Sequence, residues 1–240
     1  MRANLSPPRI RLWLVPALLL LVKCGVAAQT VRPLIAELGN PAKGRVEYVN
    51  DSLTPLNVVL MARSFGVSET GEISYRDLDP NIHLKLSATS FRVQPQQSYF
   101  VFYEATSDDA PAWFVIYAAF SGFPFRTQQG MNVRLELPHT VYLLPKQPLE
   151  KSQVRVVRAE YHRESKKALL EVENTGEQFG RVQQTFLASK KKKQEGPGFP
   201  LFPHSRRILE VSVDGVDDPD RLILDFQNFK IEDKVTVSSP

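Results

Sequence analysis

The sequence has almost no cysteine and few histidines. Its one cysteine, Cys24, lies near the start of the 240-residue chain, so the rest of the chain forms no disulfide within itself and depends on hydrophobic cores. No two histidines have the i, i+4 spacing of a metal site on a helix. The four histidines are His83, His139, His162 and His204. We therefore expect neither a metal nor another cofactor.

The short motifs of common catalytic and nucleotide-binding sites are also missing. The sequence has no G-x-S-x-G, no phosphate loop and no G-x-G-x-x-G, so we do not expect an enzyme. Acidic residues gather at Asp108–Asp109 and at 214–220. Both groups are typical of turns, because Asp side chains accept hydrogen bonds from nearby backbone N–H groups. A calcium site at the second group is the alternative, although its spacing differs from that of known calcium loops.

Residues 1–28 have the parts of a secretory signal peptide. Three arginines precede the apolar run Leu12–Val22, which is too short to span a bilayer. The small residues Val26–Ala28 then mark a cleavage site before Gln29. We expect export and cleavage, with no stable membrane insertion afterwards; an uncleaved anchor is the alternative.

Positive charge is concentrated in that first segment. The whole chain has a formal net charge of +4, and residues 1–28 hold four basic residues and no acidic one, so residues 29–240 are formally neutral. A neutral chain gives no support to nucleic-acid binding, and we expect none. The run Lys190–Lys193 is interpreted as a solvated hairpin loop, with a patch for anionic lipid or another acidic surface as the alternative.

Alternating apolar and polar residues predict β-strands throughout residues 29–240. Clear examples are Gly44–Asn50, Ile82–Ser87 and Ser98–Ala105, separated by turn signals rich in Asn, Asp, Gly and Pro. No stretch of ordinary helix length has convincing 3.6-residue periodicity. Short strands with regular turns are typical of sandwiches, so we predict an all-β fold of two immunoglobulin-like (Ig-like) β-sandwich domains in tandem.

A proline-containing polar stretch divides the pattern. Pro145 and Pro148 restrict the backbone there, as in a short, stiff linker. We predict a first domain over residues 29–146, a linker over 147–153 and a second domain over 154–240.

The two halves are loosely alike. Val46–Asp51 resembles Leu170–Thr175, since each is an alternating strand with Asn near its end. Phe91–Tyr103 resembles Phe199–Val211, since each has a proline turn that leads into the next strand. The similarity suggests two domains of related design.

Aromatic residues gather in two runs, Tyr99–Tyr103 and Trp113–Phe120. Large aromatics most often serve a core, so we interpret the runs as neighbouring strands of one core. An exposed aromatic recognition face is the alternative.

Four sequence patterns lead to a family resemblance. They are "VRPLIAELG" with "GRVEYVNDSLTPLNVVLMARSF", then "FRVQPQQSYFVFY", "APAWFVIYAAFSGFP" and "MNVRLELPHTVYLLPK". In this order residues 31–146 resemble the first domain of the periplasmic pilus-assembly chaperones, the PapD-like family, with Gln96 where the family usually has glycine. Residues 151–240 are similar in length and order to its second domain.

The resemblance implies a periplasmic chaperone that binds and caps pilus or fimbrial subunits. Such subunits are sandwiches that lack a strand, and the chaperone completes them by donor-strand complementation, a form of β-strand addition. Met131, Val133, Leu135 and Leu137 share one face and would be the donor residues; their alternative role is the chain's own core. An outer-membrane usher would be the second partner. The alternative function is a secreted two-domain adhesion or scaffold protein without chaperone activity.

One departure from the family concerns the anchor for the client's C-terminal carboxylate. The family uses an Arg of the first strand and a Lys of the last strand, in a cleft between the domains. Arg32 matches the Arg, whereas the Lys position falls on Thr140, which has a hydroxyl but no charge. Arg134, His139 and Lys146 are the nearby alternatives, and none of them matches by register.

Overall fold

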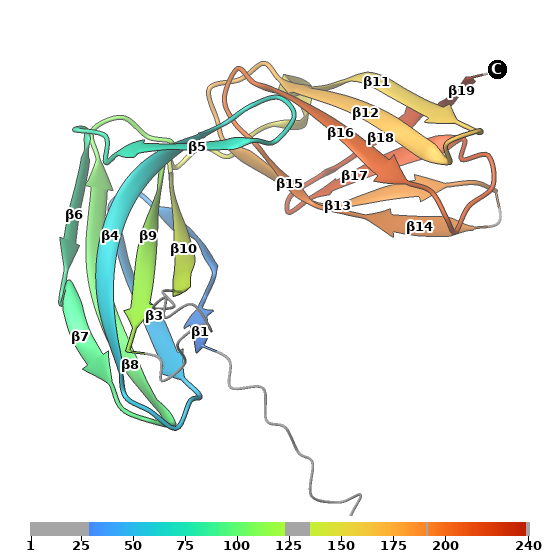
Figure 1. Cartoon of the computed structure of the whole chain (residues 1–240). Helices are drawn as coiled ribbons and strands as arrows, with labels where there is room; N and C mark the ends of the chain where they lie inside the picture. Colours follow the sequence, from blue (N-terminus) through green and yellow to red (C-terminus); the bar gives the residue numbers. More distant parts are fainter. Residues whose placement is uncertain (1–28, 123–134, 191, 239–240) are drawn as a thin grey trace, which may run out of the picture.

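The protein consists of two β-sandwiches joined end to end in an L shape (Figure 1). The computed structural model describes residues 29–122, 135–190 and 192–238. Within these ranges the elements are strands, apart from one short 3-10 helix, η1, at Lys151–Gln153. The prediction of an all-β fold with two Ig-like sandwiches is confirmed. Within the described ranges, no helix is long and apolar enough to cross a membrane.

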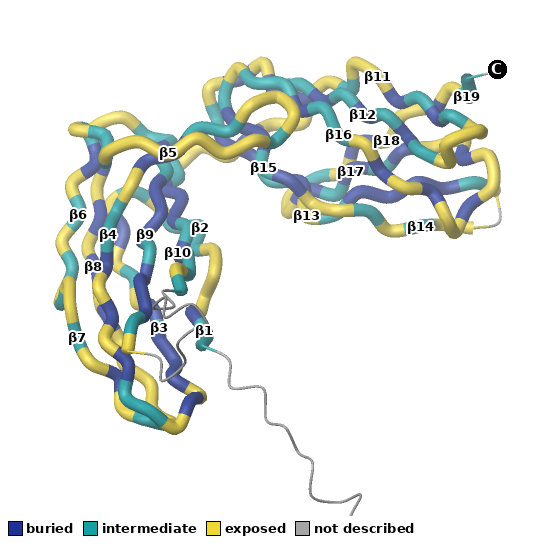
Figure 2. The backbone as a smooth tube through the Cα atoms, viewed as in Figure 1, coloured by how far each residue is buried: buried dark blue, intermediate teal, exposed yellow. Residues whose placement is uncertain are grey.

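The described residues of the first sandwich form ten strands. They are β1 Gln29–Arg32, β2 Ile35–Gly39, β3 Ala42–Asn50, β4 Leu56–Val67, β5 Ile73–Asp77, β6 Ile82–Leu86, β7 Ser90–Val93, β8 Gln97–Ser107, β9 Ala112–Ser121 and β10 Leu135–Leu144. One sheet has the order β1-β3-β8-β6, and the facing sheet has the order β2-β10-β9-β4-β5 with β7 beside β4. Buried residues occur along the strands of both sheets (Figure 2). They form one core, in which Tyr48, Phe114 and Phe120 are the largest fully buried side chains.

The second sandwich has its own core. Its strands are β11 Val154–His162, β12 Lys167–Asn174, β13 Gly180–Ala188, β14 Lys193–Gly196, β15 Phe199–Leu201, β16 Arg206–Ser212, β17 Arg221–Phe226, β18 Lys230–Lys234 and β19 Thr236–Ser238. The sheets are β16-β12-β11-β19 and β14-β13-β17-β18, with β15 beside β13. Leu170, Leu187 and Leu222 are fully buried between them.

The lysine run lies at the connection between β13 and β14, and its last residue, Lys193, begins β14. Ser189 N donates to Lys192 O at 2.9 Å, and the described lysines of the turn are exposed. Lys191 lies outside the described residues. The hairpin-loop interpretation of this run is confirmed.

The two aromatic runs lie in opposite sheets. Strand β8 belongs to one sheet of the first sandwich and β9 to the other, so the prediction that they are neighbouring strands is wrong. The expected single core is confirmed, because Val101 and Tyr103 of β8 are buried with Phe114 and Phe120 of β9. Alternation shows which side chains share a face, but not which sheet the next strand joins.

A buried asparagine occupies the same place in both sandwiches. Asn50 Nδ2 donates to the carbonyl oxygens of Thr54, Val93 and Gln94, at 2.8, 3.1 and 3.2 Å. Asn174 Nδ2 donates in the same way to Gln178, Leu201 and Phe202, at 2.7, 3.5 and 3.0 Å.

The oxygen of each asparagine accepts a backbone N–H two residues further on, from Ser52 at 3.0 Å and from Gly176 at 2.9 Å. Both side chains are fully buried, and each ties the end of one strand to the proline turn of another. The loose sequence similarity between the halves therefore corresponds to a shared structural feature, a buried asparagine that is hydrogen-bonded to backbone groups of two segments.

The N-terminal strand of the first sandwich changes sheets. Strand β1 pairs antiparallel with β3 in one sheet. After Pro33 and Leu34 the chain crosses the edge of the sandwich, and β2 pairs parallel with β10 in the other sheet. The crossing segment therefore connects the terminal strand of one sheet, β1, to the terminal strand of the other, β2, which lies beside β10.

Candidate functional site

Strand β10 presents different side chains on its two faces. Leu135 and Leu137 are half-buried and pack against the core of the first sandwich. Pro138 and Thr140, which alternate out of step with Leu137 and His139, line a cavity on the opposite face. The other two predicted donor residues, Met131 and Val133, lie outside the described residues. Leu135 and Leu137 thus continue the core to the edge of the sandwich.

Only half of β10 has a neighbour on each side. Residues Thr140–Leu144 pair with β2, and the longer stretch Leu135–Leu143 pairs with β9. Within the described ranges, the half from Leu135 to His139 therefore has no strand on the β2 side. Pro138 falls in this half; it cannot donate a ladder hydrogen bond, so it suits a position with a strand on one side only.

His139 links three segments at the inner end of this edge. Its side chain is fully buried, with Nδ1 donating to Pro33 O at 2.6 Å and Tyr103 OH donating to Nε2 at 3.1 Å. Burial lowers the pKa of His139, and the bond to Pro33 opposes this only in part. His139 therefore holds the strand crossing in place as a neutral side chain, and is not a cation at the surface.

The two predicted anchor residues lie in different sheets. Arg32 is the last residue of β1 and lies opposite Glu47 in the register of β1 and β3. Thr140 lies opposite Ile35 of β2 and Val115 of β9. The backbone of Thr140 reaches the same crossing, because its N–H donates to Leu34 O at 2.8 Å. Arg32 does not line the cavity that Thr140 lines. That both side chains contact the C-terminal carboxylate of a client remains a prediction.

That cavity lies in the cleft between the two sandwiches and has a volume of about 240 Å³. The first sandwich contributes β4, β5, β9 and β10, and the second contributes Pro200 and Arg207. Most of the lining is aliphatic or aromatic, including Phe65, Ile73 and Tyr142.

An aromatic cluster joins the sandwiches next to the cavity. It consists of the buried residues Phe65, Val115, Tyr142, Phe179 and Phe202. Tyr142 and Phe179 stack at 4.5 Å, and Trp113 packs against Phe202 at 4.5 Å, measured between ring centroids. Trp113 Nε1 also donates to Phe65 O at 2.8 Å. The cluster fixes how one sandwich sits on the other.

Arg181 adds a polar link at the same junction. Its guanidinium pairs with Glu37 of β2 and lies 4.9 Å from the ring centroid of Tyr142. Burial by itself would lower the pKa of Arg181, but the bond to Glu37 raises it above its ordinary value. Arg181 and the cluster were not predicted as functional, since their partners are distant in sequence.

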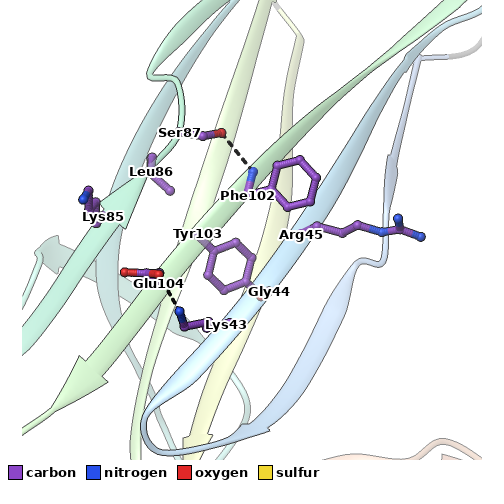
Figure 3. A pocket seen from close by; sticks show the side chains of 9 residues that line it. All are labelled: Lys43, Gly44, Arg45, Lys85, Leu86, Ser87, Phe102, Tyr103 and Glu104. Atoms are coloured by element: carbon purple, nitrogen blue, oxygen red, sulfur yellow. Dashed lines mark hydrogen bonds and ion pairs between the residues drawn. The ribbon is translucent and has the colours of Figure 1, made fainter.

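A hollow on the outer face of β3, β6 and β8 is larger, at about 580 Å³ (Figure 3). Lys43, Arg45, Lys85 and Glu104 surround it, with Lys43 Nζ 2.9 Å from Glu104. Phe102 in its lining is 58% exposed. The aromatic run of β8 is therefore divided between the core and an exposed face.

No family model matches the sequence, and no curated protein sequence matches it. Solved structures with the same fold include a chain of the Salmonella enterica SafA pilin in complex with the SafB chaperone, with a TM-score of 0.57 and 10% identity over 87% of this chain and 97% of that one.

Two further structures are also of chaperones. The class 5 fimbriae chaperone CfaA has a TM-score of 0.55 and 10% identity, over 87% of this chain and 99% of that one. The E. coli chaperone DraB has a TM-score of 0.52 and 15% identity, over 87% of this chain and 98% of that one. The chain thus has the two-sandwich fold of these fimbrial chaperones, as the resemblance implied.

Proposed function

We propose that this protein is a periplasmic chaperone that caps pilus or fimbrial subunits by donor-strand complementation. The half-paired strand β10 carries the proposal. In the described half from Leu135 to His139 the strand ladder continues on the β9 side only, and Leu135 and Leu137 pack at the end of the first core, where a client's core would continue. Met131 and Val133 extend the same alternation in the sequence.

A client strand that pairs here would extend the sheet on the side of β10 where the described residues supply no strand beside Leu135–His139. An incomplete client sandwich has the complementary defect, since it exposes a groove where its last strand is missing. Strand addition then supplies main-chain hydrogen bonds for affinity and alternate side chains for specificity. The fold shared with SafB, CfaA and DraB supports this proposal.

The proposal includes export and a second partner. The predicted signal peptide over residues 1–28 would bring the chain to the periplasm, and an outer-membrane usher would receive the loaded chaperone. Arg32 and Thr140 are proposed to contact the client terminus, Arg32 from β1 and Thr140 from the cleft.

Co-purification with a subunit that lacks its last strand tests the proposal. We expect Leu135→Arg to reduce the recovered subunit at least about tenfold, because a buried unpaired charge in the seam is costly. Leu53→Arg is the matched control, since Leu53 is 85% exposed on the same sandwich. Both variants should stay folded, because Leu135 is only half-buried. Equal capture by the two variants would contradict the donor-strand mechanism.

The hollow around Phe102 favours a second candidate, a binding module without chaperone activity. Exposed aromatic side chains beside Lys43 and Arg45 suit an adhesive surface. Phe102→Ser should then abolish binding to a cell or matrix surface, whereas it should leave subunit capture unchanged if the chaperone proposal is correct.

A further inference from the structure

One face of the first sandwich combines exposed aromatic and basic side chains. Phe100 and Phe102 of β8 alternate with the buried residues Val101 and Tyr103, so both rings lie on the outer side of the sheet. Phe100 is 43% exposed, and Phe102 lines the hollow of about 580 Å³ that Figure 3 shows. We call this surface the basic-aromatic face; its members are Lys43, Arg45, Lys85, Phe100 and Phe102.

Basic side chains from both neighbouring strands flank the rings. Arg45 of β3 lies opposite Phe102 in the register, and its Cζ is 5.4 Å from the ring centroid of Phe100. On the other side of β8, Lys85 of β6 belongs to the lining of the same hollow. Within the part of the chain that the structure describes, neither Arg45 nor Lys85 forms an ion pair. Both cations are therefore available to another molecule.

The face has an excess of positive charge, although residues 29–240 as a whole are formally neutral. Three cationic side chains and one acidic one, Glu104, line the hollow, which leaves a net of two positive charges. Lys43 Nζ is 2.9 Å from Glu104 and contributes most to lowering the pKa of that carboxyl group. Further along β3, Glu47 is matched by Arg32 of β1, so it does not change the excess. The face is therefore complementary to an anionic partner.

An anionic membrane surface fits this combination better than a folded protein does. Stable protein interfaces usually bury about 800 Å² on each partner around a shaped core, whereas the exposed apolar part here is two rings. A bilayer needs no matching shape, because aromatic side chains collect at the headgroup level and each Lys or Arg near the surface adds attraction to anionic lipids. Basic residues beside exposed apolar side chains are typical of surfaces that lie on a membrane without spanning it.

We propose that the basic-aromatic face docks on an anionic membrane. Phe100 and Phe102 enter the headgroup region. Arg45 and Lys85 contact the anionic headgroups. The face belongs to the sheet opposite the one that contains β10, so a client strand and a membrane would use different surfaces of the first sandwich. Membrane docking therefore does not depend on the proposed chaperone function.

Sedimentation with lipid vesicles tests the docking. The exported protein is used, because the apolar run in residues 1–28 would itself bind lipid. Vesicles of phosphatidylcholine are compared, at low ionic strength, with vesicles of phosphatidylcholine and phosphatidylglycerol in equal amounts. We expect about tenfold to thirtyfold tighter binding to the anionic vesicles, the effect of about two charges near an anionic surface, and a smaller difference at high salt. Equal binding to both kinds of vesicle, or binding to neither, would overturn the proposal.

Variants that remove charge locate the contact. We expect the double variant Arg45→Gln with Lys85→Gln to lose the preference for anionic vesicles. The matched control is Arg63→Gln with Arg92→Gln, which removes the same charge from exposed positions on β4 and β7 in the opposite sheet. We expect this control to keep the preference. An equal loss in both double variants would overturn the assignment to this face, because the attraction would then depend on net charge alone.

Tryptophan substitutions report whether the rings enter the bilayer. We expect brominated lipids in the anionic vesicles to quench the added fluorescence of Phe102→Trp and to leave that of Leu53→Trp unchanged. Leu53 is the matched control, because it is 85% exposed on the same sandwich but lies outside the face, in the β3–β4 connection. Equal quenching of the two variants, or quenching of neither, would overturn the proposed orientation.

Soluble polyglutamate distinguishes an acidic polymer from a membrane. We expect it to bind less tightly than the anionic vesicles, because it offers no apolar layer to the rings. We also expect Phe102→Ser to weaken vesicle binding about tenfold, since its ring would no longer leave water. Its unfolding free energy should change little, because Phe102 is 58% exposed. Polyglutamate binding as tight as vesicle binding, or vesicle binding that Phe102→Ser leaves unchanged, would overturn the membrane as the partner.

Discussion

The two sandwiches share a framework and differ at their edges. Asn50 and Asn174 make the same set of hydrogen bonds, and each proline turn next to them has a residue with positive φ, Gln96 at 58° and His204 at 49°. The first sandwich has a crossing strand that leaves half of β10 paired on one side, within the described ranges. The framework thus specifies the fold, and the edge is where the first sandwich departs from it.

The edges have different consequences for partners. In the second sandwich β13 is flanked by β17 on one side and by β14 and β15 on the other. Unpaired strand edges are usually covered, because they can pair with other chains. Under the proposed function, the half of β10 that has a described strand on one side only is the part that binds a partner, whereas the second sandwich contributes Phe179 and Phe202 to the junction.

Substitution of the two buried asparagines should give the largest losses of stability. Asn50→Leu and Asn174→Leu each leave several buried backbone groups without a partner, and each orphaned group costs about 1–3 kcal/mol. We expect each variant to lose about 4 kcal/mol of unfolding free energy, measured by urea denaturation. A near-neutral result for one of them would break the equivalence of the two sandwiches.

The aromatic junction should come next. Phe202→Ala removes a buried ring that contacts Phe65 and Trp113 across the junction, at a cost of about 3 kcal/mol. We expect the unaltered protein to unfold in one calorimetric transition and this variant to unfold in two. Phe186→Ala is the control, because Phe186 is buried in the second sandwich outside the cluster. Separate transitions in the unaltered protein would show that the sandwiches are uncoupled.

Most of the fold could be predicted from local patterns. Period-2 alternation and turn residues gave the all-β class, and the Asn-turn and proline-turn similarity gave the relation between the halves. Alternation could not assign β8 and β9 to opposite sheets, because sheet membership depends on long-range pairing. The repeat was informative because one physical device, a buried amide that accepts and donates to backbone, needs asparagine in both places.

The candidate site was less predictable. Alternation identified Leu135 and Leu137, but their half-burial at an open edge depends on where β2 ends its pairing with β10. Arg207 had no local signal, since its partners are carbonyl groups of Ser68 and Glu69, more than a hundred residues away in sequence. Contacts between domains are set by packing, which a strand pattern does not encode.

Between pH 7 and pH 5 we expect a pH effect from the buried His139 at the strand crossing of the first sandwich. The pKa of His139 is lowered in the folded state, so the unfolded chain binds the proton more readily and the folded chain loses stability as pH falls. The contribution of His139 is fully present above its unfolded pKa of about 6.5 and decreases below it, by at most about 1.4 kcal/mol per pH unit. We expect the stability difference between the unaltered protein and His139→Gln to shrink from pH 7 to pH 5. If both proteins lose the same unfolding free energy from pH 7 to pH 5, the pKa of His139 does not differ between the folded and unfolded states.

The smallest effects should come from the two positive-φ residues. Glycine adopts this conformation without the Cβ clash that other residues incur, so Gln96→Gly and His204→Gly each remove local strain of about 1 kcal/mol. The side chains offset part of that gain, because Gln96 Nε2 donates to Asp51 O and His204 Nε2 lies 2.8 Å from Glu177. We expect each variant to gain about 0.5 kcal/mol in urea denaturation. Gln96→Ala and His204→Ala are the controls, since they lose the same side-chain contacts but keep the strain, and they should be less stable than the glycine variants by similar amounts in both sandwiches. A glycine advantage in only one sandwich would show that the two proline turns are not equivalent.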